Sequence, residues 1–264
     1  MSEHADRIIA ALRSGHDHLA SLARGLGPDD LTRRSGAAEW DVSQVLSHLG
    51  SGAEISLAAL EGALDGTGNK GMDFNKSVWA RWDAMSPGER AESLVPASEA
   101  LVTRYESLDA RTREDLRIDL GFLPMPVDVA TAARMRLSEF TFHTWDVEVA
   151  FDPAAVLAPA ATGLLLDQVA MLIGHMGRAD AVKGRPVRLV VRTTAPEMSF
   201  GLDLGDVVTL GEEPAEPDAV LSTPAEWWLR LATGRHAPAY TPAGVALTGG
   251  ALTLDDLRRV FPGF

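Results

Sequence analysis

The stretch that decides the fold is Arg136-Leu-Ser-Glu-Phe-Thr-Phe-His-Thr-Trp-Asp146, which combines helical apolar periodicity with two residue types that bind metals. Glu139 and His143 are four residues apart, so on an α-helix their side chains lie on one face about a turn apart. This carboxylate and imidazole can bind one ion if another helix supplies a third ligand. Two histidines and one glutamate with an open position commonly hold catalytic zinc.

A second stretch, Trp40-Asp-Val-Ser-Gln-Val-Leu-Ser-His48-Leu, offers the third ligand. Asp41 is a plausible N-cap, and the apolar residues that follow it repeat at helical spacing. His48 flanks that apolar stripe, so we expect it to face inward. The competing interpretation is that Glu139 is a solvated helix charge and that both histidines are ordinary core or surface groups, because a lone E-x-x-x-H spacing is common.

Length, charge and cysteine content narrow the possible functions. The chain has 264 residues, which allows one or two domains, and a formal net charge of −13, which disfavours nucleic acid and anionic membranes as main partners. It has no cysteine, so any metal must be held by His, Asp or Glu. The N-terminus lacks the apolar region of a signal peptide, and we expect a cytoplasmic protein that is a monomer or a weak homodimer.

The periodicity predicts an α+β protein. Long helices over 4–25, 42–64, 87–108 and 127–149 form an antiparallel four-helix bundle, with a short helix near 74–85 and a fifth long helix over 159–176. Alternating apolar residues then predict strands over 187–192, 198–204, 207–210, 218–222 and 245–248, with helices after Pro224 and Thr253. We place the domain boundary near residue 183, which gives a helical bundle with an extra linking helix over 1–183 and a small α+β domain over 184–264.

The two stretches together resemble the actinobacterial mycothiol-dependent maleylpyruvate isomerase family. This resemblance implies a DinB-like bundle followed by a domain similar to sterol carrier protein type 2. The family binds a divalent metal, usually zinc, through the histidine of the first motif and the glutamate and histidine of the second. Those positions are His48, Glu139 and His143 in this sequence.

The resemblance implies a zinc-dependent, mycothiol-using enzyme that acts on a small electrophile through a metal-bound thiolate. Addition to a conjugated double bond followed by departure of the sulfur gives an isomerase, whereas retention of the sulfur gives an S-transferase. Two alternatives stay open: a non-catalytic protein that binds a small apolar ligand, and a metal-dependent hydrolase of a small thiol conjugate.

Further candidate residues lie near the two motifs. Asp146 shares the helix face of His143 and can orient that histidine through its other ring nitrogen; alternatively, it is an exposed acid. Arg136 can meet an anionic group of the cosubstrate or be a surface arginine. Trp145 can stack on the cosubstrate or pack against neighbouring side chains, and the same two roles are open to Trp40.

In the second domain, Arg235 follows a glycine in a loop and can bind a substrate carboxylate through two hydrogen bonds. We prefer Arg235 for this role to Arg230, which lies on a helix. Either can instead be a solvated charge. His16 and His18 are two residues apart, so they cannot share a helix face, and we expect both at the surface.

Overall fold

The computed structural model describes residues 2–182 and 186–263, which form two compact units, Met1–Asp152 and Pro153–Phe264. The division therefore falls earlier than the boundary that we predicted near residue 183. The reason is that α8 (Pro159–Met176), which we had assigned to the bundle, packs against α9 (Ala225–Ala232) and β5 (Val208–Gly211) of the second unit. Among the described residues, no helix is long and apolar enough to cross a membrane.

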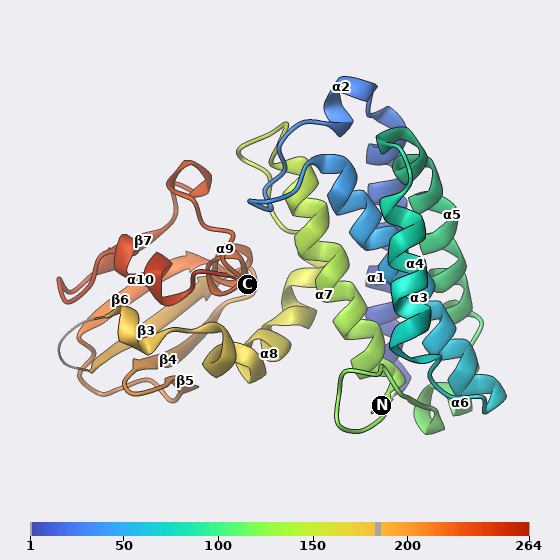
Figure 1. The fold of residues 1–264 in the computed structure, drawn as a ribbon. Coiled ribbons are helices and arrows are strands. Elements are labelled where there is room, and N and C mark those ends of the chain that lie inside the picture. The colour runs from blue at the N-terminus through green and yellow to red at the C-terminus, as the bar shows by residue number, and fades with distance from the viewer. Residues whose placement is uncertain (1, 183–185, 264) are drawn as a thin grey trace. The chain divides into compact units, whose positions relative to one another are not determined.

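The first unit is helical apart from a two-stranded ribbon (Figure 1). Its elements are α1 (Ser2–Gly25), α2 (Pro28–Leu31), α3 (Val42–Asp65), α4 (Gly71–Asp83), α5 (Pro87–Glu106), α6 (Ala110–Asp115), β1 (Arg117–Ile118), β2 (Val127–Asp128) and α7 (Val129–Glu148). The four long helices and the short helix α4 were all predicted from periodicity, and α2, α6 and the ribbon were not.

The long helices α1, α3, α5 and α7 form a four-membered bundle in which α3 packs against both α5 and α7. Helices α3 and α7 are antiparallel: His48 meets Glu139, and one turn further along α3 the backbone of Gly52 lies against Arg136. This antiparallel contact brings the two sequence motifs together.

Helices α3 and α5 instead run parallel, which differs from the all-antiparallel bundle that we expected. Ser43 near the start of α3 contacts Arg90 near the start of α5, and Glu61 near the end of α3 pairs with Arg104 near the end of α5. The physical reason is α4, which runs back along α3 and returns the chain to the end of the bundle where α3 began. The α+β class itself is confirmed.

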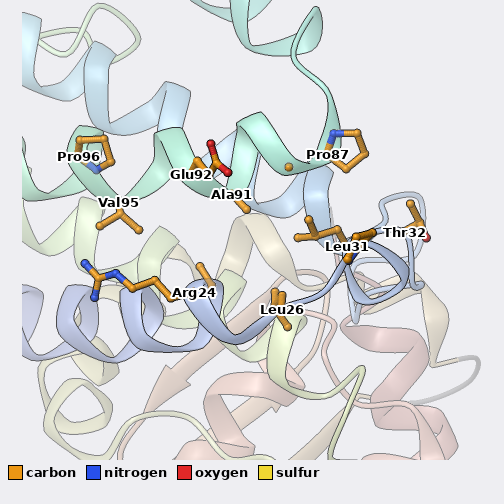
Figure 2. Close-up of a pocket in the computed structure, with 12 residues that line it drawn as sticks. Arg24, Leu26, Leu31, Thr32, Pro87, Ala91, Glu92, Val95 and Pro96 are labelled. Carbon is orange, nitrogen blue, oxygen red and sulfur yellow. The ribbon is translucent and has the colours of Figure 1, made fainter.

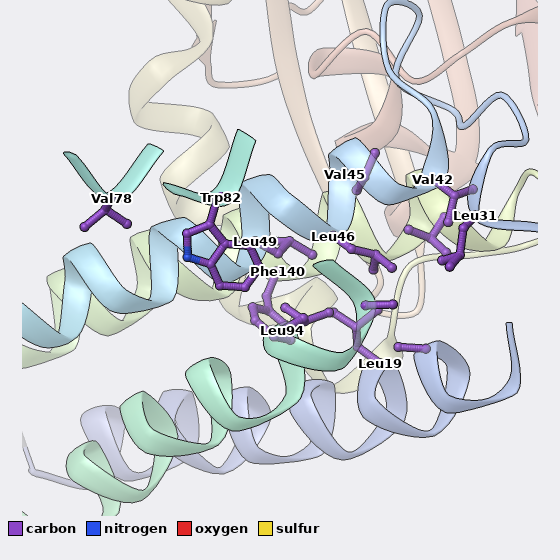
Figure 3. Close-up of a cluster of buried hydrophobic side chains, with 13 residues drawn as sticks. Leu19, Leu31, Val42, Val45, Leu46, Leu49, Val78, Trp82, Leu94 and Phe140 are labelled. Carbon is purple, nitrogen blue, oxygen red and sulfur yellow. The ribbon is translucent and has the colours of Figure 1, made fainter. Parts of the chain in front are cut away.

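Local sequence signals fix where α3 begins and what covers it. The Asp41 side chain accepts a hydrogen bond from the Gln44 backbone N–H, and the Gln44 side-chain Oε1 accepts one from the Asp41 backbone N–H, so the predicted N-cap is a complete capping box. Trp82 of α4 lies in the buried apolar cluster shown in Figure 3 and packs closely against α3. Gly50 leaves room for it, since a Cβ there would lie 2.0 Å from the indole. The Trp82 indole N–H also donates to Glu54 at 3.0 Å.

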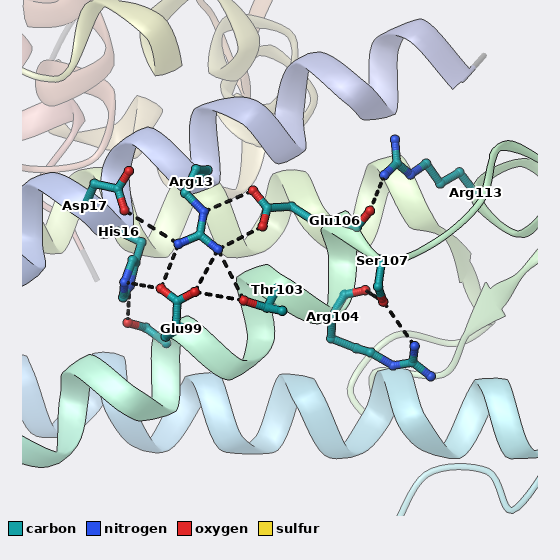
Figure 4. A network of polar contacts seen from close by, with 10 residues as sticks. Arg13, His16, Asp17, Glu99, Thr103, Arg104, Glu106, Ser107 and Arg113 are labelled. Carbon is teal, nitrogen blue, oxygen red and sulfur yellow. Dashed lines mark hydrogen bonds and ion pairs between the residues drawn. The ribbon is translucent and has the colours of Figure 1, made fainter.

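A polar network joins α1 to α5 and corrects the prediction for His16 (Figure 4). His16 is only 3% exposed, with its Nδ1 2.6 Å from Ser98 Oγ and its Nε2 2.8 Å from Glu99 Oε2. Arg13 binds both oxygens of Glu99 and also pairs with Glu106. His16 is buried because its face of α1 is covered by α5. His18, by contrast, is exposed, as predicted.

The second unit is a mixed α+β fold. Its remaining elements are the 3-10 turns η1 (Ala179–Ala181) and η2 (Pro238–Tyr240), strands β3 (Val187–Thr194), β4 (Met198–Leu204), β6 (Ala219–Pro224) and β7 (Ala246–Thr248), and helix α10 (Leu254–Val260). The sheet order is β5-β4-β3-β6-β7, in which only the β3–β6 pair is parallel among the described strands. Each strand that we predicted after residue 184 is present.

The α1–α5 network predicts a specific acid sensitivity. The hydrogen bonds from Arg13 and Thr103 lower the pKa of Glu99 to about 2, against 4.5 for an ordinary glutamate. A carboxyl group whose pKa is lower in the folded than in the unfolded state stabilises the fold at pH values above its unfolded-state pKa. This stabilisation is lost as the pH falls from about 4.5 towards 2. We therefore expect Glu99→Gln to be less stable than wild type at pH 7 and to lose less stability across that window.

Urea unfolding followed by tryptophan fluorescence between pH 2.5 and 7 measures this slope. Glu92→Gln, which makes the same change at an exposed position of α5, is the control and should keep the wild-type slope. Equal slopes for wild type and Glu99→Gln would contradict the assignment.

Candidate metal centre

Three side chains converge between α3 and α7. His48 extends from α3, and Glu139 and His143 extend from successive turns of α7. His48 Nε2 lies 2.8 Å from Glu139 Oε2, and His143 Nε2 lies 3.6 Å from the same oxygen. One ligand atom from each of the three residues lies within 4.8 Å of the others. The convergence of His48 with Glu139 and His143 is as expected from the sequence, and their binding of a metal stays a prediction.

Arg136 sets the register of the two helices behind these donors. Its guanidinium donates to the backbone carbonyl of Leu49, the residue after His48, and stacks 5.1 Å above the ring of Phe140. Gly52 permits this contact, since a Cβ there would lie 2.8 Å from the guanidinium. Arg136 is only 5% exposed, so it is a buried clamp between α3 and α7 and not the surface or cosubstrate-binding arginine that we considered.

The residues around the donors fix the orientation of His143. Asp146 is fully buried, and its Oδ2 accepts the Nδ1–H of His143 at 2.8 Å, which leaves Nε2 facing Glu139. The loop before α3 covers Asp146, because the Gly36 N–H donates to the Asp146 backbone carbonyl at 2.7 Å. Trp40 lies over both imidazoles, with ring centroids 5.1 Å from His48 and 5.7 Å from His143.

The electrostatics keep Glu139 ionised. Burial opposes the charged form, but the hydrogen bond from His48 and the positive charges of His143, His48 and Arg136 outweigh it and lower the pKa of Glu139 to about 2. Glu139 is therefore a carboxylate at neutral pH, which is the form that binds a cation.

This donor set fits a divalent cation such as zinc. Two imidazole nitrogens and one carboxylate oxygen are ordinary zinc ligands, and ligand atoms around tetrahedral zinc lie about 3.3 Å apart. The observed separations of 2.8 Å and 3.6 Å from Glu139 Oε2 bracket that value. Three protein ligands would leave a position for a substrate atom.

A second cluster, His16, Asp17 and Glu99, also satisfies the distance criterion for a metal site. There, however, Arg13 already binds both oxygens of Glu99 and approaches Asp17 to 3.5 Å. A guanidinium at the centre repels a cation, so this cluster is structural.

Comparison with known families identifies the family of the helical unit. The family model of the mycothiol maleylpyruvate isomerase N-terminal domain matches residues 12–148, more than half of the chain and a range that includes all three donors. The chain belongs to the mycothiol maleylpyruvate isomerase family.

Two solved structures of that enzyme share the fold. The crystal structure of the mycothiol-dependent maleylpyruvate isomerase has a TM-score of 0.65 and 14% sequence identity, and the match covers 94% of this chain and 95% of the other. A histidine-to-alanine mutant of the same enzyme gives a TM-score of 0.64 with the same identity and coverage. The likeness therefore spans both units, and at this identity it establishes the fold alone. No curated protein matches the sequence.

The remaining candidate residues lie in the core of the first unit, in the case of Trp145, and in the second unit, in the case of Arg235 and Arg230. Trp145 is 1% exposed and packs in the core, so it is not available to stack on a bound molecule. Arg235 lies in the second unit, where its guanidinium donates to the Thr233 carbonyl at 3.3 Å. Arg230 is 1% exposed and bound to Glu226 and to the Tyr240 carbonyl, which makes it structural.

The sequence did not identify the cavities of the first unit. A pocket of about 200 Å³ lies between α3 and α4 and shares His48 with the metal centre. A larger, mainly apolar cavity of about 780 Å³ lies between α1, α2 and α5, with Leu26, Leu31 and Val95 in its lining (Figure 2). The α3–α4 pocket was missed because nothing in the sequence indicates that α4 folds back over the His48 face.

We expect Asp146→Asn to weaken metal binding while the fold is kept. The substitution preserves the shape of the side chain but removes the negative charge that orients and polarises His143, and such changes typically cost about 10- to 100-fold in metal affinity. Competition with a chromophoric chelator measures the zinc affinity. Asp73→Asn, at an exposed position of α4, is the matched control, and an Asp146→Asn affinity equal to that of the control would remove Asp146 from the site.

Proposed function

We propose that this protein is a metal-dependent enzyme that uses mycothiol to isomerise a small electrophilic substrate of the maleylpyruvate type. The observation that carries the proposal is the convergence of His48, Glu139 and His143 at the junction of two family motifs. Membership of the family supports mycothiol as the thiol and isomerisation as the reaction. Zinc is the metal that this donor set favours.

The residues of the chain would hold the metal and the thiol in one place. A divalent cation bound there supplies positive charge that lowers the pKa of a thiol, so that the thiol is ionised at neutral pH. Glu139 neutralises only one of the two charges of such a cation, because the two histidines bind as neutral ligands. The site would therefore keep a net positive charge that attracts an anionic sulfur.

The reaction then follows from thiolate chemistry. The sulfur adds to one carbon of a conjugated cis double bond, and the displaced electron pair moves into the adjoining carbonyl as an enolate. Rotation about the new carbon–carbon single bond and expulsion of the sulfur restore the double bond in the trans form. If the enolate is protonated before the sulfur leaves, the same first step yields an S-transferase.

Arg235 is our proposed contact for an anionic group of the electrophile. It is half-buried and follows Gly234, whose φ of 82° is readily adopted only by glycine. The Arg235 backbone N–H donates to the Arg230 carbonyl at 2.7 Å, which fixes the start of this loop. A guanidinium binds a carboxylate with two parallel hydrogen bonds.

We expect His48→Ala to lose stoichiometric zinc and mycothiol-dependent turnover of maleylpyruvate, because only two of the three metal-binding side chains remain. Helical content by circular dichroism should be unchanged, since the other interactions between α3 and α7 persist. Untagged protein and metal analysis by mass spectrometry are needed, because a polyhistidine tag binds zinc. His18→Ala removes an exposed histidine and is the control; zinc retention with full activity in His48→Ala would refute the site.

We expect Arg235→Ala to raise the KM for the electrophile while zinc content and the KM for mycothiol stay at wild-type values. The reason is that only the electrophile would contact this guanidinium. Arg192→Ala, at an exposed position of β3, is the matched control for the second unit. Unchanged kinetics in Arg235→Ala with every electrophile tested would remove Arg235 from the site.

A further inference from the structure

The α3–α4 pocket opens next to the metal centre and is built from two helix faces. Gln44, Ser47, His48 and Ser51 lie at positions i, i+3, i+4 and i+7 of α3, so they form one stripe along that helix. Across from them, Trp79, Trp82 and Asp83 form a stripe of α4 at positions i, i+3 and i+4. His48 belongs both to the pocket and to the metal centre, so a molecule bound through one atom at the centre can extend directly into the pocket.

The lining combines indole faces with hydrogen-bonding groups. Trp79 is 41% exposed although it is large and apolar, and Trp40 closes the side towards the two histidines. The Ser47 hydroxyl, the Gln44 amide and the Asp83 carboxylate supply donors and acceptors in the same small space. Aromatic rings bordered by such groups suit a ring with hydrophobic C–H faces and hydroxyls around its edge.

Charge argues against an anionic occupant. Arg90 lines the pocket, but its guanidinium donates to the Trp82 and Asp83 carbonyls and to Ser43, so it mainly caps the end of α4. The Asp83 carboxylate at the same end repels a second carboxylate. The volume of about 200 Å³ is also below the roughly 300–1,000 Å³ of pockets that enclose a whole drug-sized ligand, so the pocket holds a portion of a molecule.

We infer that the α3–α4 pocket binds the polyhydroxylated sugar portion of the thiol cosubstrate while its sulfur is at the His48–Glu139–His143 centre. This inference rests on the proposed function, in which the cosubstrate is mycothiol, a cysteine thiol joined to a sugar-like polyol. The pocket would thereby select sugar-linked thiols over simple thiols, and Trp79 would be the main specificity-determining residue.

The test compares mycothiol with N-acetylcysteine, which has the same thiol chemistry and no sugar, by calorimetric titration of the zinc-loaded full chain. If the sugar gains from Trp79 an energy of the size found for aromatic pairs, about 0.5–1.5 kcal/mol, Trp79→Ala should raise the Kd for mycothiol about two- to twelvefold. The Kd for N-acetylcysteine and the zinc content should stay unchanged. Trp79→Phe, which keeps an aromatic ring, should retain most of the affinity for mycothiol. Phe122→Ala, which removes another exposed aromatic ring, is the control.

Failure of this inference can be told apart from failure of the proposed function. Equal wild-type affinities for mycothiol and N-acetylcysteine, or equal losses for both in Trp79→Ala, would overturn the sugar pocket and leave the metal centre standing. A Trp79→Ala variant that raises only the KM for the electrophile would overturn it as well, because the pocket would then hold the other substrate. Zinc-loaded wild type that binds neither thiol would overturn both.

Discussion

The contact between His48 on α3 and Glu139 on α7 is the interaction on which the site depends. It places polar groups at a helix interface, where burial without partners is costly, and hydrogen bonds and ion pairs offset much of this cost. Glu139 accepts a hydrogen bond from His48, His143 is held by Asp146, and Arg136 binds the backbone of α3 to the helix that carries Glu139 and His143. The result is a group of ligand atoms already close together in the protein alone.

The order of the helices explains how the chain brings these groups together. The antiparallel packing of α3 and α7 aligns the two motifs, although 91 residues separate His48 from Glu139. The return helix α4 makes α3 and α5 parallel and at the same time covers the face of α3 beside His48. The position of α4 thus accounts both for the mixed helix directions and for a polar, tryptophan-lined pocket next to the candidate metal centre.

Many of the helix positions, and the shared helix face of Glu139 and His143, were predictable from local sequence. Asp41 and Gln44 mark the start of α3, and the spacing of Glu139 and His143 places both on one face of α7. Helical spacing shows which residues share a face, but it does not show which neighbour covers that face. His16 and Arg136 were misplaced at the surface for this reason, because their partners Ser98 and Leu49 are 82 and 87 residues away. The domain boundary differed because apolar periodicity gives the existence of α8 and not the unit against which it packs.

The most direct test of the central claim is anomalous diffraction at the zinc edge from crystals of untagged protein grown with zinc. Our account predicts a single strong peak bonded to His48 Nε2, Glu139 and His143 Nε2. The His16–Glu99 cluster should carry no peak, since Arg13 already neutralises it. A peak at that second cluster with none between α3 and α7, or zinc bound only at lattice positions, would contradict the account.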